Sequence, residues 1–516
     1  MDRSSDDAYR PRLHYTAADT WINDPNGLVY ADGTYHLFYQ NNPYGTDHAS
    51  MSWGHAVSTD LLHWQDRPVA IACDDNEQVY SGSAVVDESN TSGLGAPGTS
   101  PLVAVYTSAF TEWSRYPGIQ AQSLAYSVDG GETWTKYKGN PVLTRNSSDF
   151  RDPKVFRYNG AATAYWVMVA VEAADRKIVV YRSDDLRGWT FLSQFEASTS
   201  PGTIWECPDL FPLAVDNDPE NTQWVLIVSL GRDASEGGSA AIYFIGDFDG
   251  VTFTPASRNV ETDEPKWEWL DHGRDHYATV SFNDTPDGRR ILLGWMDNWA
   301  YARHVPTSAW RGAMTLPREA SLHTHDGRVV LRQRVVAGLE PSGRILTHRP
   351  VHIPEGAHRL ATEPPDEPYL LEATFAAGSS REFGLILRQS EAEGTRVGYD
   401  TVRKQLILDR TASGNVSFSP FFPVRHHAPV DLIDGLLHLQ IYVDTSSVEI
   451  FAQQGLVTIT DQIFPSPSSV GASLYSLHGA AKLTSLEVTP LEQTPVVRDR
   501  ARGIGPHAAC NPSGPN

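Results

Sequence analysis

A strand–turn–aromatic pattern recurs along the first half of the chain, and it limits the possible folds more than any other sequence feature. The four copies are AVSTDLLHW, AYSVDGGETW, YRSDDLRGW and FIGDFDGVTF, which end at Trp64, Trp134, Trp189 and Phe253. Their intervals of about 55–70 residues are long enough for about four strands each. The pattern therefore favours the blades of a β-propeller over a sandwich, with ordinary hairpin turns as the alternative explanation.

A second regularity predicts the number of blades and the position of a site. Polar clusters occur next to hydrophobic strands at five places, residues 23–27, 81–83, 151–153, 206–209 and 275–277. We place each cluster directly before the innermost strand of a blade, so that all five surround one end of the central channel. The sequence therefore predicts a five-bladed β-propeller with its functional site at that end.

The pattern of the whole chain is that of an all-β protein. Short runs such as AYWVMVAVE and QWVLIVSL alternate with turns rich in Gly, Pro, Asn and Asp. The repeat fades after about residue 335, and later runs such as LLHLQIYVD alternate as in a β-sandwich. We expect a propeller over residues 1–335, a linker over 336–350, a sandwich over 351–497 and a disordered tail over 498–516.

The charge balance limits the possible partners and the location. The chain has 41 basic and 63 acidic residues, a formal charge of −22. Nucleic acids and anionic membranes bind basic surfaces, so neither is an expected partner, and no run of 18 apolar residues is present to span a membrane. The amino terminus, MDRSSDDAYRPRLHY, lacks the apolar stretch of a signal peptide. We expect a secreted protein whose signal has been removed, with a cytoplasmic protein as the alternative.

Three carboxyl groups of the polar clusters are the candidates for catalysis. They are Asp24 in WINDPNG, Asp152 in FRDPKVF and Glu206 in WECPDL. Glycoside cleavage needs two carboxyl groups, one to protonate the leaving oxygen and one to attack or to activate water. An apolar setting between a tryptophan and a cysteine suits Glu206 to the acid role. Each also has a structural alternative when taken singly. Asp24 fits a turn, Asp152 an ion pair with Arg151, and Glu206 a structural salt bridge.

The sequence contains no motif for metal or cofactor chemistry. HExxH, CxxC, an EF-hand loop, a G-x-S-x-G elbow and a phosphate loop are all absent. The three cysteines, Cys73, Cys207 and Cys510, are too few for a disulfide framework, and Cys207 has no partner at ligand spacing. We therefore expect neither a metal ion nor a cofactor.

Taken together, the motifs resemble those of glycoside hydrolase family 32. WINDPNG, FYQNNP, WGHAVSTDLLHW, SGSAV, FRDPKV, WECPDL and DHYATVSF follow that family's order and approximate spacing. GWMDNWAYARHVPTSAWRGAMTLPRE is similar to the exo-acting levanase and inulinase branch, and SVEIFAQQGLVTITDQIFP resembles the family's sandwich. The resemblance covers about residues 12–490 and implies a five-bladed propeller followed by a β-sandwich.

The resemblance implies a retaining β-fructosidase that releases terminal β-D-fructofuranosyl units from sucrose, levan or inulin. Asp24 would be the nucleophile, Glu206 the acid/base and Asp152 the group that stabilises the transition state. The positions that match the family's fructose subsite are Asn23, Gln40, Trp53, Ser83 and Arg151. Neighbouring motifs add three further substrate-binding candidates, for which scaffolding is the alternative role: Asp209, Asp275 and Trp295.

Two positions depart from the family's pattern, Ile22 where methionine is commoner and His272 where tyrosine is usual. Neither is a catalytic carboxylate. For the leaving-group side, the candidates are Asn42, Tyr44, His48 and the loop around Trp113, with an ordinary surface loop as the alternative.

Two other functions are compatible with the motifs, a transfructosylase that uses the same residues and a non-catalytic fructan-binding propeller. The sequence does not rank sucrose, inulin and levan, and it leaves the oligomeric state undetermined. For the sandwich, structural support is favoured over sugar binding.

Overall fold

The structure, a computed structural model, describes residues 8–160, 164–231, 238–494 and 496–498 of the 516-residue chain. Strands dominate the described residues, in which the helices are two short 3-10 turns, η2 (Ala302–His304) and η3 (Gln453–Gly455). Apart from Arg498, the tail predicted to be disordered lies outside the described residues.

The first part of the chain forms five antiparallel groups of strands in chain order. The first group contains β1 (Trp21–Ala31), β2 (Thr34–Asn42), β3 (Ser52–Ser58) and β4 (Gln65–Ile71). The second contains β5 (Glu77–Val86), β6 (Leu102–Phe110), β7 (Gln120–Ser127), β8 (Thr135–Lys136) and β9 (Leu143–Ser147). The third contains β10 (Phe150–Asn159), β11 (Ala164–Glu172), β12 (Lys177–Ser183) and β13 (Thr190–Glu196).

The fourth group contains β14 (Ile204–Val215), β15 (Asp218–Gly231), β16 (Ala240–Phe248), β17 (Phe253–Pro255) and β18 (Glu268–Trp269). The fifth contains β19 (Tyr277–Ser281), β20 (Arg290–Trp295), β21 (Arg318–His325) and β22 (Arg328–Val335). A single parallel bridge between Val215 and Leu322 joins the fourth and fifth groups.

The innermost strands of the five groups close into a ring. Strand β1 contacts β5, β5 contacts β10, β10 contacts β14, β14 contacts β19, and β19 contacts β1 again. The first group is joined to the last by two backbone hydrogen bonds, in which Tyr30 N–H donates to the carbonyl of Asn283 at 3.0 Å and Asn283 N–H donates to the carbonyl of Leu28 at 2.9 Å. Five antiparallel sheets around one axis form a five-bladed β-propeller, and closure leaves no inner edge unpaired. The fold class predicted from the five polar clusters is confirmed.

A β-bulge occurs within or beside each polar cluster. Pairing with the neighbouring strand shifts between Ile22 and Pro25, Tyr80 and Gly82, Arg151 and Lys154, Glu206 and Asp209, and Tyr277 and Val280. The expectation that every cluster precedes its strand is wrong, because four clusters lie inside strands and the fifth ends at the first residue of β19. A bulge redirects a side chain without ending the strand. The bulges thus explain how polar residues and strand pairing occur in the same segment.

The second domain is a sandwich of two antiparallel sheets. One contains β23 (Leu346–His348), β24 (Val351–Ile353), β26 (Tyr369–Ala376), β31 (Leu436–Val443), β32 (Ser447–Ala452), β33 (Val457–Gln462) and β35 (Ala481–Pro490). The other contains β25 (Gly356–Arg359), β27 (Glu382–Gln389), β28 (Thr395–Asp400), β29 (Gln405–Asp409), β30 (Arg425–Pro429) and β34 (Gly471–Leu477). Strand β23 lies within residues 336–350, which were expected to form a linker. It forms a strand because it pairs with β35 from the far end of the domain.

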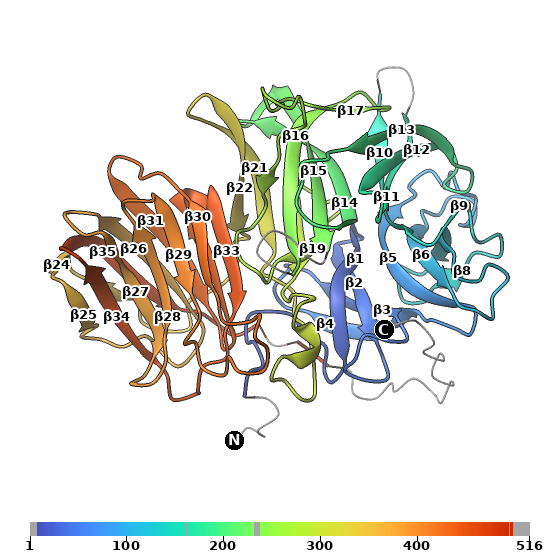
Figure 1. Cartoon of the computed structure of the whole chain (residues 1–516). Helices are drawn as coiled ribbons and strands as arrows, with labels where there is room; N and C mark the ends of the chain where they lie inside the picture. The colour runs from blue at the N-terminus through green and yellow to red at the C-terminus, as the bar shows by residue number, and fades with distance from the viewer. Residues whose placement is uncertain (1–7, 161–163, 232–237, 495, 499–516) are drawn as a thin grey trace.

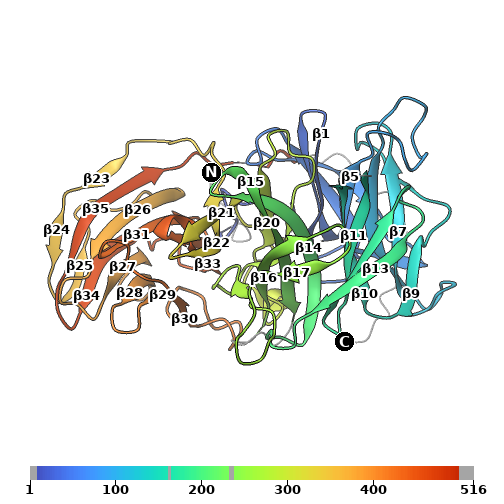
Figure 2. The same ribbon diagram turned by 90° about the horizontal axis from the view of Figure 1, so that it is seen from above.

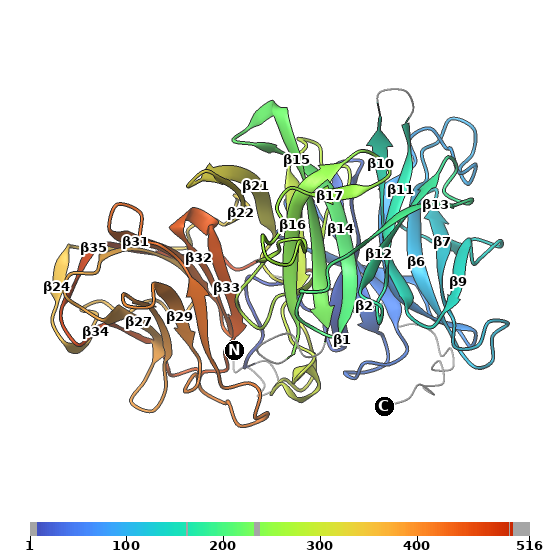
Figure 3. The same ribbon diagram turned by 45° about the horizontal axis from the view of Figure 1, so that its top comes forward.

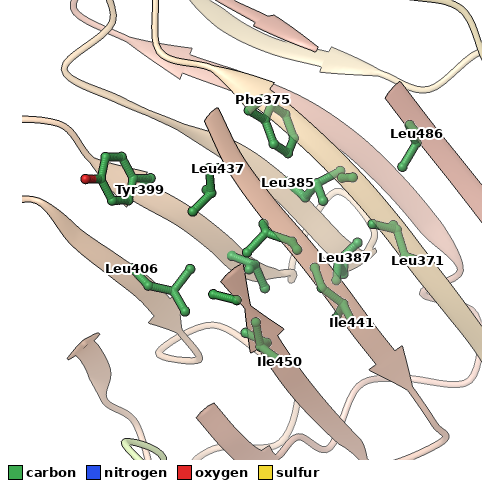
Figure 4. Close-up of a cluster of buried hydrophobic side chains, with 14 of the residues drawn as sticks. Leu371, Phe375, Leu385, Leu387, Tyr399, Leu406, Leu437, Ile441, Ile450 and Leu486 are labelled. Atoms are coloured by element: carbon green, nitrogen blue, oxygen red, sulfur yellow. The ribbon is translucent and has the colours of Figure 1, made fainter. Parts of the chain in front are cut away.

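The sandwich core follows from strict alternation along its strands. In β26, YLLEATFA, every second residue is buried and the others are half-buried. Figure 4 shows Leu371 and Phe375 of one sheet gathered with Leu385 and Leu387 of the other in a single apolar cluster. This burial is the main stabilising contribution that two packed sheets share.

The sandwich lies against one side of the propeller, with β33 on the near side and β24 and β25 at the far end (Figures 1 and 2). In Figure 3, β32 and β33 lie beside β21 and β22. Fully buried Arg318 of β21 crosses this interface. Its guanidinium donates to Asp271 at 2.9 Å and also to Glu449 of β32. Such paired charges fix one geometry, because an unpaired buried charge is strongly destabilising.

The chain's amino-terminal segment adds a histidine to the same interface. His14 is buried between two sandwich carboxylates, with Nδ1 2.7 Å from Asp444 and Nε2 2.8 Å from Glu449. Burial alone would lower the pKa of His14, but the two hydrogen bonds and the two negative charges raise it from 6.5 to about 9. The protonated imidazolium donates to both carboxylates and ties the amino terminus to the sandwich.

We expect His14→Gln to lower the stability of the folded chain by about 3 kcal/mol near pH 6, the value of a pKa raised from 6.5 to about 9. Since the folded-state pKa is raised, this contribution is complete below about pH 6.5 and disappears as the pH rises through about 9. Urea unfolding of the wild type and of His14→Gln, once near pH 6 and once above about pH 9, measures the difference in stability.

His63→Gln is the matched control, because the His63 side chain is 51% exposed and its carboxylate partner is Asp60 at the surface. That substitution should leave the unfolding midpoint nearly unchanged. A stability difference for His14→Gln that is the same at both pH values would contradict the proposed protonation state.

Candidate active site

The three predicted carboxyl groups come together at one end of the propeller channel. Asp24 lies on β1, Asp152 on β10 and Glu206 on β14, each beside the bulge of an innermost strand. The thiol of Cys207 links two of them, because Sγ is 3.5 Å from Asp24 Oδ2 and 3.7 Å from Asp152 Oδ2. Three groups that are far apart in the sequence thus form one acidic cluster.

Asp24 is held as a hydrogen-bond acceptor. Ser81 Oγ donates to its Oδ2 at 2.7 Å, and Asn23 Nδ2 donates to its Oδ1 at 3.0 Å. The indole of Trp21 donates to Asn23 Oδ1 at 2.7 Å, which fixes the orientation of that amide. Burial raises the pKa of Asp24, the bonds from Ser81 and Asn23 lower it, and the charge of Glu206 raises it further. The donors favour the ionised, nucleophilic form.

Asp152 is the most buried of the three carboxyl groups and has a left-handed backbone. Its φ of 59° is unusual for a residue with a Cβ atom and costs of order 1–3 kcal/mol. Its backbone N–H donates to Thr107 Oγ1 at 2.9 Å, and its Oδ2 accepts the N–H of Cys207 at 2.9 Å. Burial raises the pKa of Asp152 to about 7, although Arg151 opposes this shift, and the charges of Glu206 and Asp24 add to it.

Glu206 lies between a cation and a phenol. Arg151 donates to Glu206 Oε1 through Nη2 at 3.0 Å and Nε at 3.1 Å, and the hydroxyl of Tyr277 donates to Oε2. Arg151 is also 3.3 Å from Gln120 Oε1 and close to Asp149. The Glu206 side chain is 19% exposed, so it faces the open end of the channel while both oxygens are oriented.

The other three predicted fructose-subsite residues also make hydrogen bonds within the protein. Gln40 Nε2 donates to Asn26 Oδ1 at 2.7 Å, and Trp53 Nε1 donates to the carbonyl of Tyr80 at 3.0 Å. Ser83 Oγ donates to the carbonyl of Pro153 at 2.9 Å and joins β5 to β10. All three are buried. A substrate contact for Gln40, Trp53 and Ser83 stays a prediction, and their observed contacts join or orient blades one to three.

The remaining candidates have scaffold contacts. Fully buried Asp209 lies 3.1 Å from Lys154 Nζ, and Asp275 accepts from Arg410 of the sandwich and, at 2.6 Å, from Tyr301. The ring of Trp295 is buried, 6.3 Å from the ring of Tyr277 and packed against other tryptophans. These contacts correspond to the scaffolding role that the sequence left as the alternative. Asp275 in particular belongs to the interface between the domains.

The leaving-group candidates differ in exposure. Trp113, in the loop between β6 and β7, is 66% exposed, and Tyr44 is 41% exposed. Asn42 is buried and donates to the carbonyl of Asp47 at 2.8 Å. The ring of His48 packs at 5.1 Å from that of Trp299. Trp113 and Tyr44 are therefore the most exposed of these candidates.

Sequence reasoning missed three residues that contact the carboxyl groups, Ser81, Cys207 and Tyr277. Each lies in a polar cluster that the sequence identified. Considering every polar residue of those clusters would therefore have found them. Burial and the neighbouring carboxylates raise the pKa of the Cys207 thiol well above its usual range, so the thiol stays protonated. It can then donate to Asp24 as a neutral group.

Comparison with known proteins adds independent information. Residues 14–333 match the description "Glycosyl hydrolases family 32 N-terminal domain", and residues 354–490 match "Glycosyl hydrolases family 32 C terminal". The chain is 45% identical over 496 residues to a levanase of Bacillus subtilis, a match that covers 95% of this chain and 71% of the levanase. It is 39% identical over 521 residues to an extracellular exo-inulinase of Aspergillus awamori, which covers 95% and 96% of the two chains.

Solved structures agree with these matches. The crystal structure of exo-inulinase from Aspergillus awamori superposes with a TM-score of 0.87 at 36% identity, covering 96% of this chain and 100% of that one. A β-fructofuranosidase from Schwanniomyces occidentalis, complexed with fructosyl-erythritol, superposes with a TM-score of 0.84 at 28% identity. That match covers 95% of this chain and 99% of the other.

Proposed function

Because the chain belongs to glycosyl hydrolase family 32, we propose a mechanism and a mode of cutting for it. It is a β-fructofuranosidase, a glycosidase that hydrolyses terminal fructosyl units of fructans or sucrose. The observation that supports the mechanism is the cluster of Asp24, Asp152 and Glu206, in which each carboxyl group has a different set of neighbours.

In the proposed first step, Asp24 attacks the anomeric carbon of the terminal fructosyl unit. Glu206 protonates the departing glycosidic oxygen, so the C–O bond breaks and a covalent fructosyl ester of Asp24 forms. In the second step Glu206 takes a proton from water, and the resulting hydroxide equivalent displaces Asp24 from the anomeric carbon. Two displacements at one carbon give retention of configuration.

The neighbours of each carboxyl group suit these roles. Ser81 and Asn23 donate to Asp24, which stabilises it as a carboxylate before attack and after the ester is cleaved. Arg151 and Tyr277 orient Glu206, and Arg151 stabilises the negative charge left when the proton is given away. We assign both as positioning residues.

Asp152 is proposed to bind hydroxyl groups of the fructosyl ring. Its carboxyl group already accepts the N–H of Cys207, and it can accept ring hydroxyls in the same way. Hydrogen bonds that strengthen as charge develops on the ring would stabilise the transition state. The left-handed backbone at Asp152 holds the carboxyl group in the cluster.

We expect fructose to be the first product from levan or inulin. Beneath the cluster, Lys154 of blade three lies 3.1 Å from Asp209 of blade four and donates to Ser281 of blade five, so buried side chains close the channel. A blind pocket accepts the end of a chain and not its middle. Chromatography of early time points measures the ratio of fructose to oligosaccharides. Early accumulation of mixed oligosaccharides with little fructose would contradict this exo mode.

We also propose that the protein acts outside the cell. The Aspergillus relatives are named extracellular exo-inulinases, and the acidic composition suits that location. Among the described residues, no helix has the length and apolar character that crossing a bilayer requires. Fructosidase activity confined to washed cells of the native host, with none in the medium, would contradict secretion.

A further inference from the structure

A second polar pocket lies in the sandwich, on the β25–β34–β27–β28–β29–β30 sheet and separate from the carboxylate cluster. Its cavity has a volume of about 650 Å³, within the usual range of small-molecule sites. We propose that this pocket is a second carbohydrate site that binds a fructosyl unit of the polymeric substrate. The class of sugar rests on the proposed function, and the pocket itself rests on the contacts described below.

The pocket's polar residues come from one face of the sheet. Glu382 of β27 pairs with Asp400 of β28, and Asp400 pairs with Gln405 of β29, so the three form a row across adjacent strands. The alternate residues Phe383 and Leu406 point into the sandwich core. Period-two alternation therefore directs the row away from the core. Glu382 and Asp400 are nevertheless 9% and 3% exposed, so they are recessed and not ordinary surface carboxylates.

The two carboxylates are fixed before any ligand binds. Glu382 accepts from Arg425 of β30 at 2.6 Å and from the Tyr475 hydroxyl at 3.1 Å. Asp400 accepts two backbone N–H groups at 2.9 Å and the guanidinium of Arg403 at 3.2 Å. A site with pre-oriented polar groups loses less entropy on binding.

The buried side chain of Tyr475 lies beside this row on the same face of the sheet, where its hydroxyl reaches Glu382. A Cβ atom at Gly398 would lie 2.0 Å from the Tyr475 oxygen, so only glycine lets the ring lie against the sheet. The guanidinium of Arg396 covers the ring at 5.4 Å from its centroid. Tyr475 is therefore unavailable for stacking on a sugar, and recognition must use hydrogen bonds to hydroxyl groups. That requirement suits a furanose ring, which is small and rich in hydroxyls.

The pocket combines both signs of charge, because Arg381, Arg403 and Arg425 line it together with Glu382 and Asp400. Arg425 and Arg403 are each paired with a carboxylate, so the pocket presents donors and acceptors side by side. Adjacent sugar hydroxyls can accept from a guanidinium and donate to a carboxylate at the same time. A fully ionised phosphate group could accept from these arginines but could not donate to Glu382 or Asp400, whereas a polyol can do both.

The pocket opens towards the propeller. Arg403, Gln405 and His427 also line a groove of about 1080 Å³ between the two domains, whose opposite wall includes Trp269. A fructan with one unit in the pocket can therefore continue along the groove. Binding at a second site would keep the polymer near the enzyme and raise the local concentration of chain ends.

The test uses the full-length chain and a paired set of variants. Arg403→Ala with Gln405→Ala removes two pocket side chains, and the Arg403 side chain is 61% exposed, so its loss leaves the core intact. Lys482→Ala with Gln440→Ala is the control, because it removes the same kinds of side chain from the other sheet. Both pairs are placed in the Asp24→Asn background, and affinity electrophoresis in gels that contain levan measures the apparent Kd.

We expect the pocket pair to raise the apparent Kd for levan by about tenfold and the control pair to leave it within about twofold, a difference of about 1.4 kcal/mol. With Asp24 restored, sucrose turnover should be unchanged in both pairs, since sucrose needs only the carboxylate cluster. Equal retardation of the pocket pair and the control would overturn the proposal, as would loss of levan binding on addition of inorganic phosphate. If the pocket pair does not fold, Arg403→Ala alone is tested, with about a threefold loss expected.

The same experiments distinguish failure of the proposed function from failure of the second site. A parent enzyme that releases no fructose from sucrose would contradict the function whatever the levan gels show. An active parent whose pocket pair still binds levan normally would contradict only the second site.

Discussion

Replacing Asp24 with asparagine is expected to reduce sucrose turnover by about 10⁴-fold or more while the chain still folds. An amide cannot form the fructosyl ester, so the double-displacement route is lost. Asparagine has the same shape as aspartate and keeps one oxygen to accept from Ser81 or Asn23, so the local structure should be preserved. Fructose release is measured on protein whose mass excludes deamidation.

Asp32→Asn is the matched control, because Asp32 is exposed in the turn that follows β1 and asparagine tolerates its φ of 48°. Its activity should equal that of the wild type. Activity of Asp24→Asn within about tenfold of the wild type, a barrier difference of only about 1.4 kcal/mol, would exclude Asp24 as the nucleophile.

Replacing Glu206 with glutamine should slow sucrose cleavage by about 10²–10⁴-fold, the usual cost of lost acid–base catalysis. A sugar alkoxide leaves poorly unless it is protonated. An aryl fructoside with an acidic phenol as its leaving group needs little protonation, so formation of the fructosyl enzyme should be largely spared. The second step should then be slow, because the same residue activates water. A burst of phenol followed by slow turnover is the expected kinetic trace.

Azide separates the acid/base role of Glu206 from a structural one. It is a nucleophile that needs no base, so it should speed turnover of Glu206→Gln on the aryl fructoside and yield β-fructosyl azide. Asp24→Asn is the control, since it forms no fructosyl enzyme for azide to attack. If azide has no effect on Glu206→Gln, or the product is the α-anomer, then Glu206 is not the acid/base or the mechanism is not retaining.

The sequence predicted the number of blades because five polar clusters follow the chain at blade-like intervals. It could not place those clusters inside the strands. The shift at Ile22–Pro25, for example, appears only when β1 is paired with β2. A bulge is a property of two strands in register, and one strand's residues do not show it.

In the candidate site, too, some residues could be predicted from the sequence and others could not. Asp24, Asp152 and Glu206 could be proposed from their motifs, because carboxyl groups are the chemistry that glycoside cleavage needs. Their neighbours could not be ranked from sequence. Ser81 donates to Asp24 whereas Ser83, two residues later, joins β5 to β10, and period-two alternation permits either serine to face the cluster until the bulge at Ser81 is known.

Asp275 is the clearest example of a residue whose contacts the sequence could not predict. Its motif is adjacent to Tyr277, which reaches Glu206, yet the Asp275 carboxylate pairs with Arg410 of the sandwich. The sequence by itself determined the all-β class, the five blades and the three carboxyl groups, because hydrophobic periodicity and residue chemistry are local. Only the tertiary structure decided which neighbours tune each carboxyl group, which charges hold the domains together and where the second polar pocket forms. Those properties depend on contacts between residues of different strands, which lie 55 positions apart for Arg151 and Glu206 and 135 positions apart for Arg410 and Asp275.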